Sequence, residues 1–383
     1  MKPKQVSAVV FIGILLMVPF IMWASGGFDE LPQFDSNKLL SGEYITKAFS
    51  GEYALKLEKF VKEHFPMRNE LSAMGWNIRF RTGSKEIDGY FITDDSIIKN
   101  VGSPNKRLVK NNNEVILKFA QDVDLPMCIM LIPTASAVKQ QALPAFATPY
   151  NQKTFIEGVY QSFGGGLATV DAYPVLFANQ EKSLFYNTED GVAPLGGYYV
   201  YTALCPKLRI ATNPMSRYTI EYAVHGYEGS LCKRFPYATD KKDVISLYHY
   251  RNDKISRNYM LCRTDGDSKI SINDLYDRSA LKGEAPLDVF FGGPYQTVDI
   301  NVFSSTGKPP PNQTRLLIFG DETVKSYLPF LAPQYGEIKV VNAETVTAEQ
   351  ADEIDLLYYD QVLFAFSTDT YMHCENLEVL SVL

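Results

Sequence analysis

Short unbroken apolar runs alternate along this chain with segments whose apolar residues recur at helical spacing. The runs predict buried strands at 126–133, 167–173, 316–320, 338–341 and 361–366. The intervening segments predict helices at 152–163, 194–205, 323–335 and 347–357. Strands that are apolar on both faces and separated by helices are typical of a parallel sheet covered on both sides. We therefore expect an α/β fold, namely an α/β/α sandwich with a mainly parallel sheet.

The pattern changes between about residues 206 and 312. Polar and apolar residues alternate there, as in "YTIEYAVHGYEG" and "VISLYHY", and turn residues separate the runs. The stretch ends in "GKPPPN", which predicts a stiff return to the sheet. Alternation with a period of two is the pattern of half-buried strands, so we expect a β-rich insertion at 206–312.

The N-terminus predicts attachment to a membrane. Lys2 and Lys4 precede an uncharged apolar run at 6–24, and the segment 28–35 that follows carries acidic residues. A run of this length just spans a bilayer as a helix, and lysines before it favour a cytoplasmic N-terminus. The residues after the run make a poor site for signal peptidase. We therefore expect an uncleaved anchor in preference to a removed signal sequence.

Three parts of the chain follow from these patterns. Residues 1–27 are the anchor or signal sequence, and residues 28–70, with "EYALKLEKFVKEHF", predict a juxtamembrane helical segment. Residues 71–383 form the α/β domain that contains the insertion. With the N-terminus inside, this domain lies outside the cytoplasm on a single-pass membrane protein.

Composition and charge exclude several classes of function. The 383 residues are 46% hydrophobic, which is ample for a large packed core. A net charge of −7 and a pI near 5.3 provide no basic stripe, so nucleic acid is not an expected partner. The five cysteines are scattered without CxxC spacing, which argues against a zinc cage or a dense disulfide framework. Their odd number leaves at least one thiol free in a monomer, and Cys128 is expected to be a buried hydrophobe.

The segment "LLIFGDETVKSYLPFL" at 316–331 predicts a strand, a sharp turn at Gly320 and a helix. Functional residues of an α/β sheet collect at the carboxyl ends of its strands, where loops lead into helices. An esterase or acyltransferase of the SGNH type places its nucleophilic serine directly after a Gly-Asp pair at such a turn. Backbone N–H groups there are aimed at the oxyanion.

Longer motifs resemble one family along nearly the whole predicted domain. "LLIFGDETVKSYLPFLAPQYGEI", followed by "YDQVLFAFS", is similar to the C-terminal signature of the DHHW family. These are SGNH-like cell-envelope proteins related to the alginate O-acetyltransferases. "FPMRNELSAMGWNIRF", "LIPTASAVKQQALP", "YNTEDGVAPLGGYYVY" and "FFGGPYQTVDIN" follow the same family in the same order. The resemblance implies an SGNH-like fold.

The chain departs from the family at the positions that carry the chemistry. The family's loop reads approximately YYRTDHHWTSLGAYYAY, and this chain keeps its tyrosines and its Leu-Gly pair but not its acid-base groups. The resemblance implies that Glu189 replaces the orienting aspartate and Gly191 the general-base histidine. Asp190 and Val192 replace the first histidine and the tryptophan. Glu322 stands where the family has serine after Gly-Asp.

These replacements predict that no catalytic residue remains at the family positions. A carboxylate at Glu322 would form a mixed anhydride in place of a stable ester intermediate, and Gly191 offers no imidazole. The nearby hydroxyls of Thr323 and Ser326 are expected to point elsewhere.

The histidines do not replace the missing base. Asp369 and His373 follow the last strand four residues apart, and could form a dyad in a chain that had a nucleophile. We favour the interpretation that both lie on an exposed C-terminal helix. His225 and His249 lie in alternating β patterns and are expected to be packed or surface residues.

A candidate pocket follows if the fold is kept. Its residues are Glu189, Asp190, Gly320, Asp321 and Glu322. The four carboxylates among them would converge, and would then bind a hard cation such as calcium, raise their pKa values or spread into water. Spreading into water is the favoured outcome, and the cation site is the alternative.

Two hypotheses for function remain. The leading one is a membrane-anchored, extracytoplasmic pseudoenzyme that binds glycan or acts as an assembly partner in cell-envelope polysaccharide modification. Its partners would be the membrane, a cell-envelope glycan or a membrane-bound acyltransferase, and no cofactor is expected. The alternative is an active carbohydrate O-acetyltransferase or acetylesterase with an unconventional site.

Overall fold

The computed structural model describes residues 68–236, 238–251, 257–304 and 314–382. The chain divides into two compact units, residues 1–84 and 85–383. In the first unit the structure describes helix α4, Arg68–Arg81, so the expected boundary at residue 71 falls inside a helix. The predicted anchor at 1–27 and nearly all of the predicted segment at 28–70 lie outside the described residues. Within the described ranges, no helix is both long enough and apolar enough to cross a membrane.

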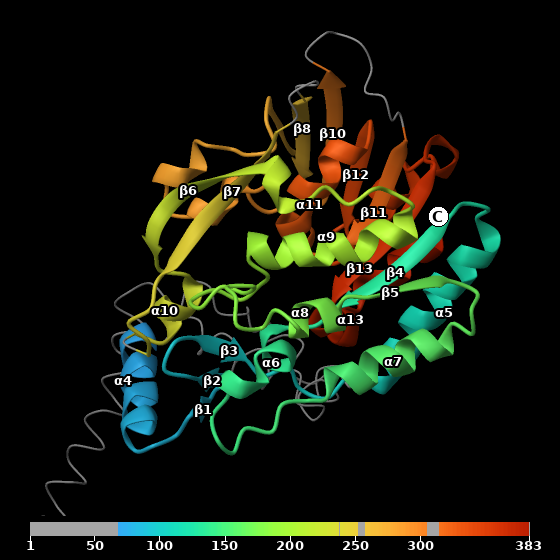
Figure 1. The fold of residues 1–383 in the computed structure, drawn as a ribbon. Helices are drawn as coiled ribbons and strands as arrows, with labels where there is room; N and C mark the ends of the chain where they lie inside the picture. Colours follow the sequence, from blue (N-terminus) through green and yellow to red (C-terminus); the bar gives the residue numbers. More distant parts are fainter. Residues whose placement is uncertain (1–67, 237, 252–256, 305–313, 383) are drawn as a thin grey trace, which may run out of the picture. The chain divides into compact units, whose positions relative to one another are not determined.

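An eight-stranded sheet organises the second unit (Figure 1). Its strands, in spatial order, are β5 (Ala168–Asp171), β4 (Met127–Ile132), β13 (Gln361–Ser367), β11 (Arg315–Gly320), β12 (Glu337–Asn342), β10 (Thr297–Ser304), β8 (Arg257–Asp265) and β9 (Ser268–Ile272). The first five are parallel to one another, and the last three are antiparallel to their neighbours. The strands predicted from the five apolar runs are the five parallel ones.

Helices cover both faces of this sheet, as the apolar runs predict. Alternate residues of each central strand face opposite sides, so Met130 belongs to one buried cluster and Ile129 to the other. One cluster packs against α9 (Pro194–Leu208) and α11 (Val324–Leu331). The other packs against α5 (Lys106–Asp122), α7 (Gln152–Ser162), α12 (Ala348–Asp352) and α13 (Thr368–His373). The α/β/α arrangement is therefore confirmed.

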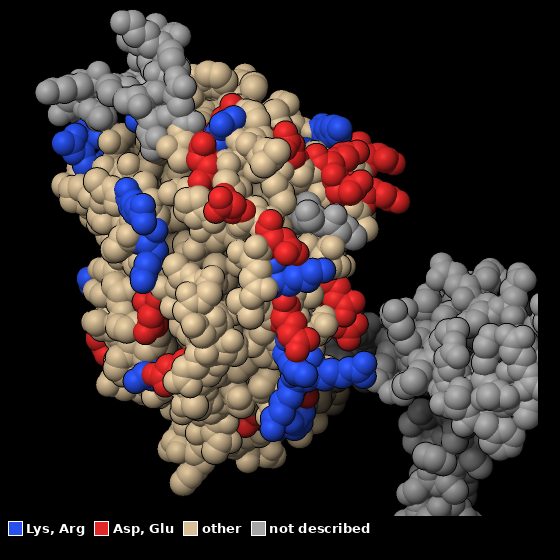
Figure 2. All heavy atoms as spheres, turned by 90° about the vertical axis from the view of Figure 1, so that its right-hand side faces the viewer, with Lys and Arg blue, Asp and Glu red and all other residues tan. Residues whose placement is uncertain are grey.

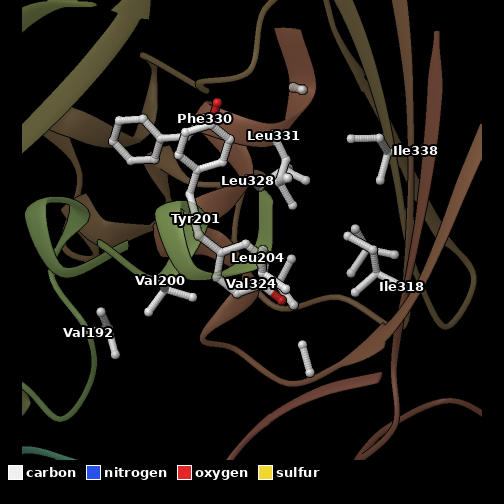
Figure 3. Close-up of a cluster of buried hydrophobic side chains, with 14 of the residues drawn as sticks. Val192, Val200, Tyr201, Leu204, Ile318, Val324, Leu328, Phe330, Leu331 and Ile338 are labelled. Atoms are coloured by element: carbon white, nitrogen blue, oxygen red, sulfur yellow. The ribbon is translucent and has the colours of Figure 1, made fainter. Parts of the chain in front are cut away.

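Helices α9 and α11 are packed closely together. Figure 3 shows Tyr201 of α9 beside Leu328 and Phe330 of α11, with Ile318 of the sheet opposite them. The close approach depends on Gly197, because a Cβ there would lie 2.0 Å from the carbonyl oxygen of Ser326. No real Cβ comes so near to a backbone oxygen, so this position requires glycine.

The stretch 206–312 contains the predicted strands but does not form a separate body. Strands β8, β9 and β10 continue the central sheet beyond β12. Only β6 (Tyr218–Tyr227) and β7 (Asp243–Tyr250) form a sheet of their own, with α10 (Ser230–Arg234) between them. Period-two alternation indicates strands, but it does not indicate which sheet they join. The "GKPPPN" segment lies outside the described residues.

Two further features were not predicted. A small antiparallel sheet follows α4 in the chain and consists of β1 (Glu86–Ile87), β2 (Tyr90–Ile92) and β3 (Ile97–Lys99). Helix α5 lies between this sheet and β4 in sequence. The predicted helix 347–357 stops at Asp352, because the Asp355 side chain caps a separate 3-10 turn by accepting a hydrogen bond from the Leu357 N–H.

The remaining elements are short. They are α6 (Ala135–Val138) and α8 (Tyr173–Phe177), with 3-10 turns η2 (Gln140–Ala142), η3 (Met215–Arg217), η4 (Ala280–Lys282), η5 (Pro286–Val289), η6 (Ala332–Gln334), η7 (Leu356–Tyr358) and η8 (Asn376–Val382). Figure 2 shows one face of the molecule, on which basic and acidic side chains lie beside one another in several places with broad uncharged areas between them.

Candidate functional site

A cavity of about 540 Å³ opens at the carboxyl ends of the parallel strands. It is lined by the segments that follow β4, β11, β12 and β13, together with the loop before α9. This is the edge at which α/β sheets bind ligands, because the strand ends and the helix starts bring polar groups together there. Of the predicted pocket residues, Glu189, Asp190, Asp321 and Glu322 line it, and Gly191, predicted at a family triad position, lines it too. Gly320 ends β11 just before Asp321 and is not part of the lining.

The loop at 186–191 is held by one buried carboxylate. Asp243, at the start of β7, is 5% exposed and accepts hydrogen bonds from the N–H groups of Asn187 and Thr188 and from the Thr188 hydroxyl, at 2.6–3.1 Å. The Thr188 hydroxyl also accepts from the Gly229 N–H at 2.9 Å. A buried carboxylate requires such a set of donors, so Asp243 ties the loop to the β6–β7 sheet.

The Glu189 carboxylate also makes hydrogen bonds in this structure. Its carboxylate accepts hydrogen bonds from the Ser230 N–H at 2.8 Å and the Ser230 hydroxyl at 2.6 Å. The Tyr227 hydroxyl donates to it at 3.3 Å. The side chain in the place of the family's orienting aspartate therefore holds the first turn of α10.

Gly191 lacks the imidazole of the family's histidine, and its backbone conformation also favours glycine. Its φ is +137°, in the region that L residues rarely adopt, although a Cβ there would meet no atom within 4 Å. A histidine would have space but would strain the backbone. The loop is thus built around glycine at the position that the resemblance assigns to the general base.

Asp190 faces a lysine that the sequence patterns did not indicate. The Lys99 ammonium lies 2.6 Å from Asp369 and 3.7 Å from Asp190. Burial opposes the charge on Lys99, but the hydrogen bond and the charge of Asp369 outweigh it and raise the lysine's pKa. Desolvation also raises the pKa of Asp190, with Asp369 and Glu189 adding to the effect and Lys99 opposing it. The Asp190 side chain is 45% exposed, so we expect that shift to be modest.

The two acidic residues of the Gly-Asp-Glu turn after β11 differ in exposure: Asp321 is buried and Glu322 is exposed. Asp321 is 2% exposed and accepts hydrogen bonds from the Thr323 N–H at 3.0 Å and the Ser367 N–H at 2.7 Å. It therefore links the ends of β11 and β13. Glu322, in the family's serine position, forms an ion pair with Lys325, and its side chain is 53% exposed.

The hydroxyls near this turn are engaged in local hydrogen bonds. The Thr323 hydroxyl donates to Asp321, and the Ser326 hydroxyl donates to the Thr323 carbonyl at 2.7 Å. Both residues line the cavity, but neither hydroxyl has a histidine partner in the structure described.

The histidines lie away from this turn. His373 Nδ1 is 3.1 Å from an Asp369 carboxylate oxygen on α13. His373 is exposed, as the favoured interpretation expects, but Asp369 is 20% exposed and lines the cavity. His249 pairs with Glu221 at 2.8 Å on the β6–β7 sheet, and His225 lies on β6. Both belong to strands, as the alternating pattern predicts.

The four predicted carboxylates reach one cavity but do not form a cation site. Each of the four has another partner. Glu189 accepts a hydrogen bond from Ser230, and Asp190 lies near Lys99. Asp321 accepts hydrogen bonds from backbone N–H groups, and Glu322 pairs with Lys325. Within the part of the chain that the structure describes, no three His, Cys, Asp or Glu residues are placed to hold a metal ion. The cation site therefore stays a prediction that this arrangement does not support. A linear sequence pattern does not reveal these separate partners.

All five cysteines are free thiols in the structure. Cys128 is buried in β4, as predicted, and Cys205 is buried in α9. Burial raises the pKa of Cys128 to about 12, so this thiol is unreactive at neutral pH.

Comparison with solved structures identifies the fold. No protein-family model matches the chain, and no curated protein matches its sequence. A DHHW family protein from Eubacterium siraeum aligns with 77% of this chain and 93% of its own, at a TM-score of 0.56 and 20% identity. Bacillus cereus PatB1, solved with a sulfonyl adduct, aligns with 76% of this chain and 97% of its own, at 0.59 and 13% identity. The O-acetyltransferase domain of Pseudomonas putida AlgJ aligns with 77% of this chain and 99% of its own, at 0.46 and 11% identity.

The chain has a DHHW/SGNH-like fold. In this DHHW/SGNH-like domain, the cavity lining includes Lys99 and Glu344, which the sequence did not single out. Lys99 ends β3 of the small sheet, which was not predicted. Glu344 follows β12, and its position after a predicted strand was the one signal that could have marked it.

Glu344 should make the stability of the DHHW/SGNH-like domain depend on pH. Desolvation in the cavity, with the negative charges of Asp321, Glu322 and Asp369, raises the pKa of Glu344 to about 7 from about 4.5. The folded state therefore binds this proton more tightly than the unfolded state. The stabilisation of the folded state by this proton is fully present below pH 4.5 and is lost as the pH rises towards 7.

We expect Glu344→Gln to raise the free energy of unfolding by about 1 kcal/mol at pH 8, a value reduced because the residue is exposed to solvent. It should have no effect at pH 4, where the native side chain is protonated in both states. Urea unfolding at both pH values tests this. Equal stability of the two proteins at pH 8 would show that the Glu344 carboxylate is simply solvated.

Proposed function

We propose that this chain is a catalytically inactive, membrane-anchored and extracytoplasmic DHHW/SGNH-like protein. It binds glycan, or holds a partner such as a membrane-bound acyltransferase, during modification of a cell-envelope polysaccharide. The observation that carries the proposal is the cavity at the ligand-binding edge of the sheet, where Glu189, Gly191 and Glu322 occupy the family's triad positions. A fold of this kind with a formed cavity and without its acid-base groups supports binding more than turnover.

The composition of the cavity supports a sugar ligand. Carbohydrates are bound by polar groups together with aromatic faces, and Phe185, Tyr186 and Phe290 line the cavity beside its carboxylates. Its volume of about 540 Å³ lies within the range of small-molecule sites. The resemblance of the sequence motifs to a family related to the alginate O-acetyltransferases is the reason to place the glycan in an acetylation pathway.

The proposal predicts no acyl transfer or ester hydrolysis. We expect the purified domain to leave acetylated oligosaccharides and p-nitrophenyl acetate unhydrolysed above the buffer rate. An organic sulfonyl fluoride, which labels activated serines, should add no mass to the protein. The physical reason is that a carboxylate replaces the nucleophile and no imidazole faces it.

The matched variant is Glu322→Ser, which restores the family's hydroxyl. It should remain inactive, because Gly191 supplies no base and its φ of +137° does not suit histidine. Turnover by the unmodified protein that disappears in Asp369→Asn or His373→Ala would instead establish the alternative, an active esterase or acetyltransferase with an unconventional site.

A further inference from the structure

The cavity has a strong excess of negative charge. Seven acidic residues line it, and they are Glu189, Asp190, Asp288, Asp321, Glu322, Glu344 and Asp369. Two basic residues, Lys99 and Lys325, also line it. Charges of one sign in a concave site repel ligands of that sign and attract ligands of the other.

Neither lysine is available to an anionic ligand. The Lys99 ammonium is shared between Asp369 at 2.6 Å and Asp190 at 3.7 Å. The Lys325 ammonium pairs with Glu322, donates to the Gly293 carbonyl at 3.1 Å and lies 5.3 Å from the centre of the Tyr295 ring. A uronate would have to break one of these contacts, and would still face the remaining carboxylates.

Two groups of the lining are unused. Among the described contacts, the Glu344 carboxyl makes no hydrogen bond or ion pair, although desolvation, followed by three acidic neighbours, raises its pKa. Tyr186 also lines the cavity and is 9% exposed, and its hydroxyl has no partner in the described structure. A buried polar atom without a partner is unfavourable, so a ligand that supplies one would stabilise the site.

We propose that this cavity binds the protonated amine of an amino sugar, with Glu344 as the carboxylate that meets the charge and Tyr186 supplying a hydrogen bond. This inference rests on the proposed glycan-binding function and specifies its ligand. A sugar ammonium matches the negative lining, and the sugar hydroxyls match a phenol that can donate or accept. A uronate, or a fully N-acetylated sugar, lacks that charge.

Calorimetry of the whole domain, titrated with four oligomers of equal length, tests the proposal. The probes are β-1,4-glucosamine, its fully N-acetylated form, an oligouronate and oligolysine. We expect glucosamine to bind at least tenfold more tightly than the acetylated form, and the uronate not to bind. Glu344→Gln should weaken glucosamine binding about tenfold and leave acetylated binding unchanged. The matched control, Glu375→Gln, removes an exposed carboxylate outside the cavity and should change neither.

The outcomes separate the inference from the function on which it rests. Equal binding of the amine and acetylated oligomers, insensitive to Glu344→Gln, would overturn the amine assignment and keep glycan binding. Tighter binding of the uronate would do the same. Oligolysine bound more tightly than glucosamine would point to a cationic peptide and overturn the sugar assignment. Binding of none of the four would overturn both the inference and the proposed function. A melting curve of each variant confirms that it is folded.

Discussion

Gly197→Ala is expected to destabilise the domain by about 3 kcal/mol, near the upper end of overpacking substitutions. The added Cβ would lie 2.0 Å from the Ser326 carbonyl oxygen, and this oxygen belongs to the backbone of α11. A flexible side chain could turn aside, but a helix backbone must move as a whole. The close packing of α9 on α11, in which Tyr201 contacts Phe330, would then be lost. Thermal melting should show a decrease of about 6 °C.

A second glycine in a helix provides the control. Gly158 lies in α7, and a Cβ there would meet no atom within 4 Å. Gly158→Ala should therefore stabilise the domain by about 0.5–1 kcal/mol, because alanine restricts the unfolded chain. If both substitutions shifted the melting temperature in the same direction, close helix contact at Gly197 would not be the cause.

Asp243→Ala should have an effect of similar or larger size, about 4 kcal/mol, because it leaves the buried donors of Asn187 and Thr188 without an acceptor. Asp243→Asn keeps one oxygen and should lose about half as much. Both free energies are measured by urea unfolding. The loop at 186–191 should also become accessible to proteases, since Asp243 is its link to β7.

The matched control is Asp240→Ala, which removes an exposed carboxylate three residues earlier in the chain. It should change the free energy of unfolding by less than about 0.5 kcal/mol. If Asp243→Ala were equally mild, water would be replacing the carboxylate and the loop would not depend on it.

Together these residues show how the loop and the strand ends around the cavity are held in place. Asp243 and Gly197 hold the loop and the helix that follows it, and neither takes part in acyl transfer chemistry. Glu189 caps α10 through Ser230, and Asp321 joins two strand ends through Ser367. The cavity is therefore held by contacts that do not depend on a serine at position 322 or a histidine at position 191. This is the physical basis for proposing a binding role.

Much of the fold could be predicted from the sequence. Runs such as "PMCIMLIP" are apolar at successive positions, and only a strand buried on both faces places such residues away from water. The parallel strands, the helices at 152–163 and 194–205 and the layered architecture follow from this. The identities of Glu189, Gly191 and Glu322 underlie the prediction that the family's catalytic groups are missing, and that stays a prediction.

Only the tertiary structure decided how the charged side chains are paired and which sheet the later strands join. Lys99 and Asp369 are 270 residues apart in the sequence, yet their side chains lie 2.6 Å apart. Strand β10 pairs with the edge of β12, β8 pairs with β10 and β9 pairs with β8, and alternation alone does not reveal this pairing. The burial of hydrophobic residues can be predicted from the local pattern of apolar positions along the chain. Electrostatic pairing depends on distances in space, so only the structure shows that the four predicted carboxylates each contact a different partner.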